Sequence, residues 1–91
     1  MAVTLPTVVL PQGVWVDIYA TIGIAVGTQI DVQNVGESDV YLRTSATDPG
    51  TARGDWQLLL RGVQARNEAN DPGEWAIALA SNGYLNVRVT T

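Results

Sequence analysis

Apolar and polar residues alternate in short runs along this chain, and Gly, Pro, Asn and Asp separate the runs. Val40 and Leu42, for example, alternate with Tyr41 and Arg43. A period of two is typical of a β-strand with one buried face. No window of a dozen residues has the spacing of an amphipathic helix. The pattern predicts an all-β protein.

Strand-like alternation marks six segments: residues 14–19, 29–33, 40–43, 56–61, 75–80 and 84–89. In the last of them we expect Leu85, Val87 and Val89 to face inwards. Asn82-Gly83 precedes it, and this dipeptide favours a type I′ hairpin turn because both central residues of that turn need positive φ. Residues 63–70 fit a short helix as readily as a polar strand.

Seven or eight short strands are too many for one flat sheet, which would leave an apolar face in water. Two sheets packed face to face or a closed barrel would both solve this, and we expect a single antiparallel β-sandwich of jelly-roll type. Pro6 and Pro11 flank a short apolar stretch, and proline is confined to strand edges. Residues 1–13 are therefore expected to form an N-terminal arm or an edge strand, and residues 14–91 the sandwich domain.

The composition narrows the possible partners. The chain has 91 residues, no cysteine and a net charge of −4, with five arginines as its only cations. A domain of this size without disulfides is marginally stable by itself, so we expect homo-oligomerisation. An acidic chain without a basic face is not expected to bind nucleic acid. No apolar run reaches the ~20 residues of a membrane span, and Met1 to Leu10 lack a charged signal-peptide start, so we expect a soluble protein made in a cytoplasm.

Catalytic chemistry has few candidates here. Without His, Cys or Lys, a hydroxyl nucleophile lacks its ordinary base, so we expect a non-enzymatic protein with no cofactor. A sugar-hydrolysing carboxylate site built on Glu68, Asp71 and Glu74 stays as an alternative. Asp48 and Asp55 offer oxygen ligands for calcium, but turn formation explains Asp48-Pro49-Gly50 equally well, and no metal site is expected.

An integrin-type tripeptide, Arg53-Gly54-Asp55, lies in the same loop. Three such residues occur readily by chance in a loop rich in Gly and Asp, so we assign it no function.

Four aromatic residues alternate with the aliphatic side chains of their strands and so are expected on the opposite face. Arg43 follows Tyr41, and Arg88 follows Tyr84, on the same strand. Aromatic residues with nearby arginines are typical anchors of protein interfaces. An alternative is that the first two aromatic residues cap the end of the sandwich. The expected interface residues are Trp15, Tyr19, Tyr41, Arg43, Tyr84 and Arg88.

Two stretches, "IAVGTQIDVQNVGESDVYLRTSATDPG" and "PGEWAIALASNGYLNVRV", carry a resemblance to a known group of proteins. Over residues 22–50 and 72–89 the chain resembles small β-sandwich proteins from the structural gene clusters of tailed bacteriophages. The resemblance implies a virion component, a capsid decoration (cement) protein that stabilises the phage head as a homo-oligomer, often a trimer. Its partners would be further copies of itself and the major capsid protein or tail proteins.

Two other functions remain open from the sequence. A tail or fibre component would use the same fold in another part of the virion. A carbohydrate- or receptor-binding module would present exposed Trp and Tyr rings to a sugar.

Overall fold

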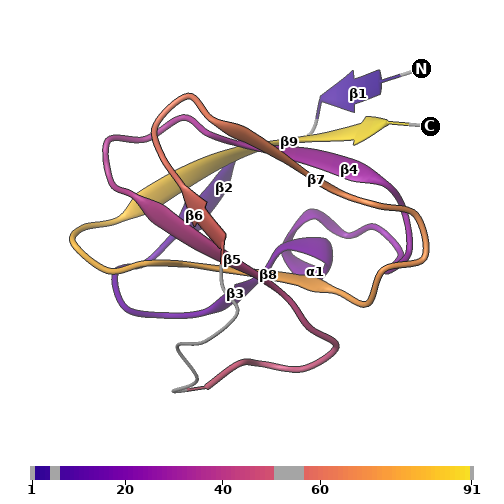
Figure 1. Cartoon of the computed structure of the whole chain (residues 1–91), viewed down its shortest axis with the longest axis horizontal. Helices are drawn as coiled ribbons and strands as arrows, with labels where there is room; N and C mark the ends of the chain where they lie inside the picture. Colours follow the sequence, from indigo (N-terminus) through magenta and orange to yellow (C-terminus); the bar gives the residue numbers. More distant parts are fainter. Residues whose placement is uncertain (1, 5–6, 51–56, 91) are drawn as a thin grey trace.

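The computed structural model of the protein describes residues 2–4, 7–50 and 57–90. Two antiparallel β-sheets pack face to face, and one short helix lies at one end (Figure 1). The elements are β1 (Ala2–Thr4), β2 (Val8–Leu10), β3 (Val16–Asp17), α1 (Ile18–Ile22), β4 (Ile30–Asn34), β5 (Val40–Thr44), β6 (Gln57–Leu59), β7 (Gln64–Asn67), β8 (Glu74–Ala78) and β9 (Gly83–Thr90). The predicted all-β sandwich is confirmed.

The strand order is that of a jelly roll. In the first sheet the order is β1-β9-β4-β7, with β2 also paired to β9, and in the second it is β3-β8-β5-β6. Because β1 and β2 lie along the same strand, β9, they fill one strand position, which leaves eight positions in two sheets of four. Between these eight positions the chain changes sheet at every connection except β5 to β6, as expected for two interlocking Greek keys.

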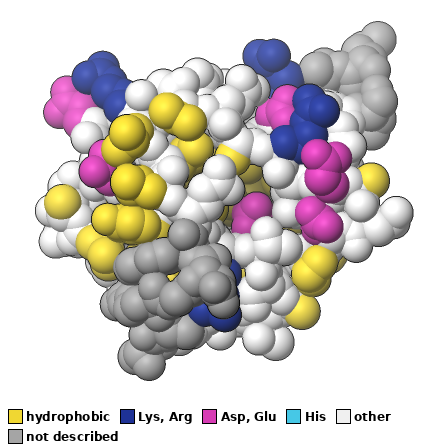
Figure 2. All heavy atoms as spheres, viewed as in Figure 1, with side chains coloured by type: hydrophobic (Ala, Val, Ile, Leu, Met, Phe, Trp, Pro, Cys, Tyr) yellow, Lys and Arg dark blue, Asp and Glu magenta, His cyan; other side chains and the backbone are white. Residues whose placement is uncertain are grey.

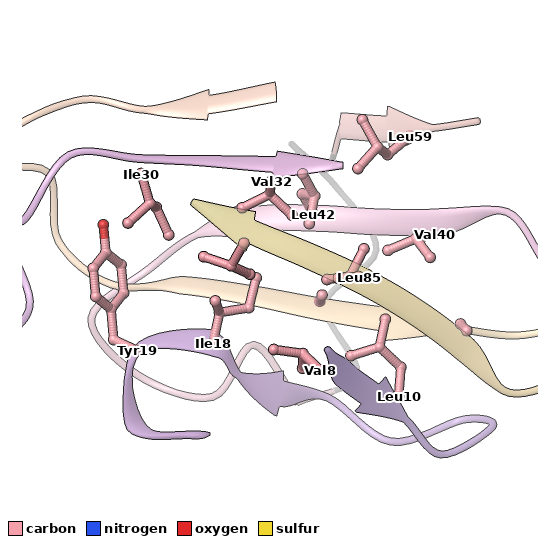
Figure 3. Close-up of a cluster of buried hydrophobic side chains, with 13 residues drawn as sticks. Val8, Leu10, Ile18, Tyr19, Ile30, Val32, Val40, Leu42, Leu59 and Leu85 are labelled. Atoms are coloured by element: carbon pink, nitrogen blue, oxygen red, sulfur yellow. The ribbon is translucent and has the colours of Figure 1, made fainter. Parts of the chain in front are cut away.

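The core lies between the sheets and consists of aliphatic side chains with Tyr19 at one end (Figure 3). Val40 and Leu42 of β5, and Leu85 and Val87 of β9, are at most 2% exposed, as the alternation predicted. Val89 is half-buried and packs against the same cluster. The inner face of each sheet is therefore apolar over its central strands.

Strand β2 lies at an edge of the first sheet. Val8 pairs with Leu85 of β9, and Val8 and Leu10 are buried in the core. These two side chains thus belong to the interior of the same molecule, whereas Val9 between them faces outwards.

Residues 63–70, which the sequence left open between helix and strand, contain β7. This strand pairs with β4 in the register Ile30↔Asn67 and forms the other edge of the first sheet.

The strand expected over residues 14–19 is wrong beyond Asp17. The Asp17 side chain accepts a hydrogen bond from Ala20 N at 3.2 Å and caps α1, which ends at Gly23 in the left-handed conformation, with φ of 72°. An Asp cap and a Gly stop enclose a single helical turn. The turn places both Ile18 and Tyr19 inside the core, which a strand cannot do with consecutive residues.

The hairpin expected at Asn82-Gly83 is also wrong, because β8 and β9 belong to different sheets. Neither residue has positive φ. Instead, a Cβ atom on Gly83 would lie 2.9 Å from Ala78 Cβ and 3.2 Å from side-chain atoms of Leu10 and Val40. Glycine is needed at position 83 because the chain enters β9 in close contact with the other sheet. The neighbouring Asn82 has a different role: its side-chain oxygen accepts a hydrogen bond from Gln12 N at 3.0 Å.

We expect Gly83→Ala to lower the free energy of unfolding by about 1–3 kcal/mol, the usual cost of adding a methyl group to a filled core. Urea unfolding followed by tryptophan fluorescence measures this change. Ser81→Ala, at an exposed position in the same connection, is the control and should stay within about 0.5 kcal/mol of the wild type. A Gly83→Ala protein as stable as the wild type would contradict the packing role.

Candidate functional site

Four of the six expected interface residues lie on outer surfaces, but on opposite sheets. Tyr41 and Arg43 are half-buried on the outer face of β5, in the second sheet. Tyr84 and Arg88 are exposed on the outer face of β9, in the first sheet. The structure therefore does not bring these residues into one patch, and their role in an interface stays a prediction.

The exposure expected for Trp15 and Tyr19 is wrong, because both side chains are buried. Trp15 is 9% exposed, and its Nε1 donates a hydrogen bond to the Gly50 carbonyl oxygen at 2.8 Å. The loop that follows β5 thus covers the indole ring. Tyr19 is 1% exposed because α1 turns it into the core, where Figure 3 shows it at one end of the cluster. The alternative interpretation, that the two residues close the end of the sandwich, describes Tyr19 better.

The Tyr19 hydroxyl is part of a buried polar cluster. Its oxygen lies 2.6 Å from the Thr28 carbonyl oxygen and 2.7 Å from the side-chain amide of Asn67. Asn67 is 2% exposed and points inwards from β7. Burial raises the pKa of the Tyr19 hydroxyl above its ordinary value of 10.0, so this group remains a proton donor.

Glu74 completes the cluster from the opposite sheet. It is 6% exposed on the inner face of β8, and Thr44 Oγ1 donates to its Oε1 at 3.2 Å. Desolvation raises the pKa of this carboxyl from 4.5 to about 7, the hydrogen bond from Thr44 opposes the rise, and the nearby Asp71 carboxylate adds to it. Near neutral pH, Glu74 therefore exists in both protonation states.

Of the three carboxylates considered for sugar hydrolysis, the structure brings two together. The same side-chain atom of Asn67 lies 3.3 Å from Glu74 Oε2 and 3.3 Å from Asp71 Oδ2. Glu68 is exposed, and its backbone N–H donates to Asp71 Oδ2 at 3.0 Å, which closes a turn. The three carboxylates do not share one open surface.

Sequence reasoning missed Tyr19 and Asn67 as partners of Glu74. The three residues come from α1, β7 and β8, and only the packing of both sheets brings them together. The sequence did contain one signal. Glu74 alternates in step with Ala76 and Ala78, so a strand that buries these two alanines also points the Glu74 carboxyl inwards.

The loop after β5 forms turns through its own side chains. Asp48 Oδ1 accepts from Gly50 N at 2.7 Å, and Ser45 Oγ accepts from Thr47 N at 3.2 Å. This is the turn chemistry expected for Asp48, whereas Arg53, Gly54 and Asp55 lie outside the described residues. Within the described part of the chain, no three acidic side chains gather as they would to hold a metal ion.

Two rows of apolar side chains cross the outer faces of the sheets. The first-sheet row is Val9, Tyr84 and Val35, which are 51%, 41% and 45% exposed. Val9 pairs with Tyr84, and Val35 N donates to the Tyr84 carbonyl oxygen. The second-sheet row is Tyr41 and Leu58, paired between β5 and β6. Leu58 is 46% exposed, and Figure 2 shows hydrophobic side chains gathered on the side of the molecule where β6 lies.

Two surface depressions lie at the end of the sandwich formed by residues 35–39 and 79–82. Each has a volume of about 450 Å³, and the two share Glu37 and Ser81. Tyr41 lines one and Tyr84 lines the other. A tyrosine and polar groups thus border the depression on either side of this end.

Comparison of the chain with protein-family models, with curated proteins and with solved structures returned no match. No helix in the described ranges is long and apolar enough to cross a membrane.

The raised pKa of Glu74 predicts that the protein becomes less stable as the pH rises. The folded state holds the Glu74 proton more tightly than the unfolded state, so this contribution is complete below about pH 4.5 and is lost as the pH rises to about 7. The loss should approach about 3 kcal/mol, from 1.36 kcal/mol per pKa unit. Glu74→Gln, which resembles the neutral acid, should abolish it.

Urea unfolding of the wild type and of Glu74→Gln at pH 5 and pH 8 tests this expectation. The wild type should lose more free energy of unfolding between the two pH values than the variant does. Glu37→Gln, which alters an exposed glutamate on the 35–39 turn, is the matched control. The expectation fails if the wild type and Glu74→Gln lose the same stability between the two pH values.

Proposed function

We propose that this protein is a non-enzymatic structural protein of a bacteriophage virion, a decoration protein that stabilises the head through contacts between its own copies and the capsid. The observation that supports this is the pair of exposed apolar rows on opposite sheets. The resemblance of residues 22–50 and 72–89 to small phage structural proteins gives the proposal its setting.

Two different apolar surfaces favour a closed ring of copies. A two-fold dimer needs one self-complementary surface, whereas a ring of three or more subunits needs two different surfaces that fit each other. In this proposal the first-sheet row and the second-sheet row serve as the two surfaces on each subunit. A homotrimer is the smallest ring that would use both.

Burial of these rows would supply stability that a chain without disulfides lacks. Apolar area removed from water contributes about 25 cal/mol per Å², and tyrosine is enriched at the centre of protein interfaces. Arg43 and Arg88 lie on the same outer faces as the rows and would bind acceptors of the capsid or of a neighbouring copy. A ring bound across capsid subunits would hold them together against pressure from inside the head.

We expect Leu58→Asp and Val9→Asp each to reduce the oligomer to smaller species, because each places a charge in one of the two rows. Light scattering at several concentrations measures the mass in multiples of the 9.7 kDa chain. A mixture of the two variants should form a two-subunit species, because each supplies the intact row that the other lacks.

Val26→Asp is the control, since Val26 is 59% exposed and belongs to neither row. A wild-type protein that stays monomeric at every concentration, or variants that assemble normally, would contradict the proposal.

Carbohydrate binding is the second candidate, and the depressions beside Tyr41 and Tyr84 favour it. Each has a volume within the usual range of small-molecule sites. Aromatic rings can stack on sugar rings, while the side chains of Glu37, Ser81 and Asn82 can bond hydroxyl groups. Binding of the isolated protein to a glycan array, lost in Tyr84→Ala or Tyr41→Ala, would support this function. An array without signal would remove it.

A further inference from the structure

The side-chain amide of Asn67 lies between groups with opposite hydrogen-bonding needs. One of its two terminal atoms is 2.7 Å from the Tyr19 hydroxyl, and the other is 3.3 Å from both Glu74 Oε2 and Asp71 Oδ2. The amide oxygen and nitrogen can exchange places by rotation about the last side-chain bond without moving any other group. The protonation state of Glu74 decides which of the two amide orientations is more stable.

With Glu74 protonated, one orientation gives each of these groups a hydrogen-bond partner and leaves a single contact between two acceptors, Asn67 Oδ1 and Asp71 Oδ2 at 3.3 Å, where Asp71 Oδ2 accepts from Glu68 N. The Glu74 O–H donates to Asn67 Oδ1, and Asn67 Nδ2 donates to the Tyr19 oxygen at 2.7 Å. The Tyr19 O–H is then free to donate to the Thr28 carbonyl oxygen at 2.6 Å. Donors and acceptors alternate along the whole chain of bonds from β8 to the loop before β4.

With Glu74 ionised, the same orientation fails, because Asn67 Oδ1 would face two carboxylate oxygens with no hydrogen between them. In the reversed orientation Asn67 Nδ2 donates to Glu74 Oε2 and Asp71 Oδ2, and Asn67 Oδ1 accepts from the Tyr19 O–H. The hydroxyl has one proton, so it can no longer donate to Thr28. The half-buried Thr28 carbonyl then loses this hydrogen bond, and the network therefore has two distinct states.

We propose that Glu74, Asn67 and Tyr19 form a proton-linked switch, in which loss of the Glu74 proton to solvent reverses the Asn67 amide and releases the Thr28 carbonyl from Tyr19. This inference does not depend on the proposed function.

The surroundings of Glu74 make the switch sensitive to a proton. The groups that face it are Thr44 from β5, Asn67 from β7, Tyr19 from α1 and Asp71 from the loop before β8. Asp71 and Tyr19 are the titratable members of this set, and Asp71 opposes a second negative charge. The raised pKa of Glu74 places the transition near neutral pH.

The switch acts on the end of the sandwich opposite the 35–39 turn. Thr28 lies in the loop between α1 and β4. In the same loop, the Gly27 carbonyl oxygen accepts a hydrogen bond from Asn70 N at 2.9 Å. Release of the Thr28 carbonyl removes the hydrogen bond between this part of the loop and the Tyr19 hydroxyl, while Ile24 N still donates to the Tyr19 carbonyl oxygen at 3.2 Å. The loop should therefore open to solvent more readily when Glu74 is ionised.

A pH titration by NMR, from pH 4 to 9, tests the switch on the protein labelled with ¹³C and ¹⁵N. We expect the Glu74 carboxyl carbon, the Asn67 side-chain nitrogen and the Gln29 amide, which follows the Thr28 carbonyl, to titrate with one shared midpoint near pH 7. Exchange of the loop amides with solvent should become faster above that midpoint. A titration of Glu74 that leaves the Asn67 and Gln29 signals unmoved would overturn the proposal.

Two variants separate the steps. Glu74→Gln should hold the Asn67 and Gln29 signals at their low-pH positions throughout, and a transition that survives in this variant would refute the switch. Tyr19→Phe keeps the ring and removes the hydroxyl, so Glu74 and Asn67 should still titrate while Gln29 no longer responds. A Gln29 signal that titrates as before in Tyr19→Phe would also refute it.

Discussion

The close packing of the two sheets is the constraint on which the rest of this structure depends. Ala76 and Ala78 on the inner face of β8 are fully buried, and Gly83 enters β9 with no room for a Cβ atom. Small residues on one side let the larger aliphatic side chains of β4, β5 and β9 fill the space between the sheets. The chain crosses between sheets at almost every connection, so this contact also fixes the jelly-roll order.

The same packing explains why an acid is buried. The inner face of β8 continues from Ala78 and Ala76 to Glu74, so the period of the strand points the carboxyl inwards. Its partners are Thr44 on the paired strand and Asn67 on the facing sheet. Buried polar groups need hydrogen-bond partners, and among the described residues no buried side-chain oxygen or nitrogen lacks one. The interior is thus apolar at its centre and titratable at one end.

The outer surfaces follow from the fold in a different way. In each sheet the residues between the buried positions face outwards, and in both sheets some of these are apolar, as in the first-sheet row and the second-sheet row. On the second sheet, the loop after β5 covers Trp15, and Ile77 is buried beside it, while Leu58 at the edge stays exposed. Apolar side chains on both outer faces of a small sandwich are the basis of the proposal that the protein works in contact with its own copies.

The sequence by itself determined the strands whose two faces differ in polarity, because side chains alternate with a period of two and only one alternate set is apolar. Val40, Leu42, Leu85 and Val87 were assigned to the core in this way. Tertiary structure decided the inner face of β6, where Leu59 is buried and Leu58 is exposed, and that of β8, where Ala76 and Ile77 are both buried. It turned Tyr19 inwards through a helical turn that local alternation does not reveal. It also brought Tyr19, Asn67 and Glu74 together, since contacts between residues far apart in the chain depend on how the sheets pack, and no local pattern encodes that.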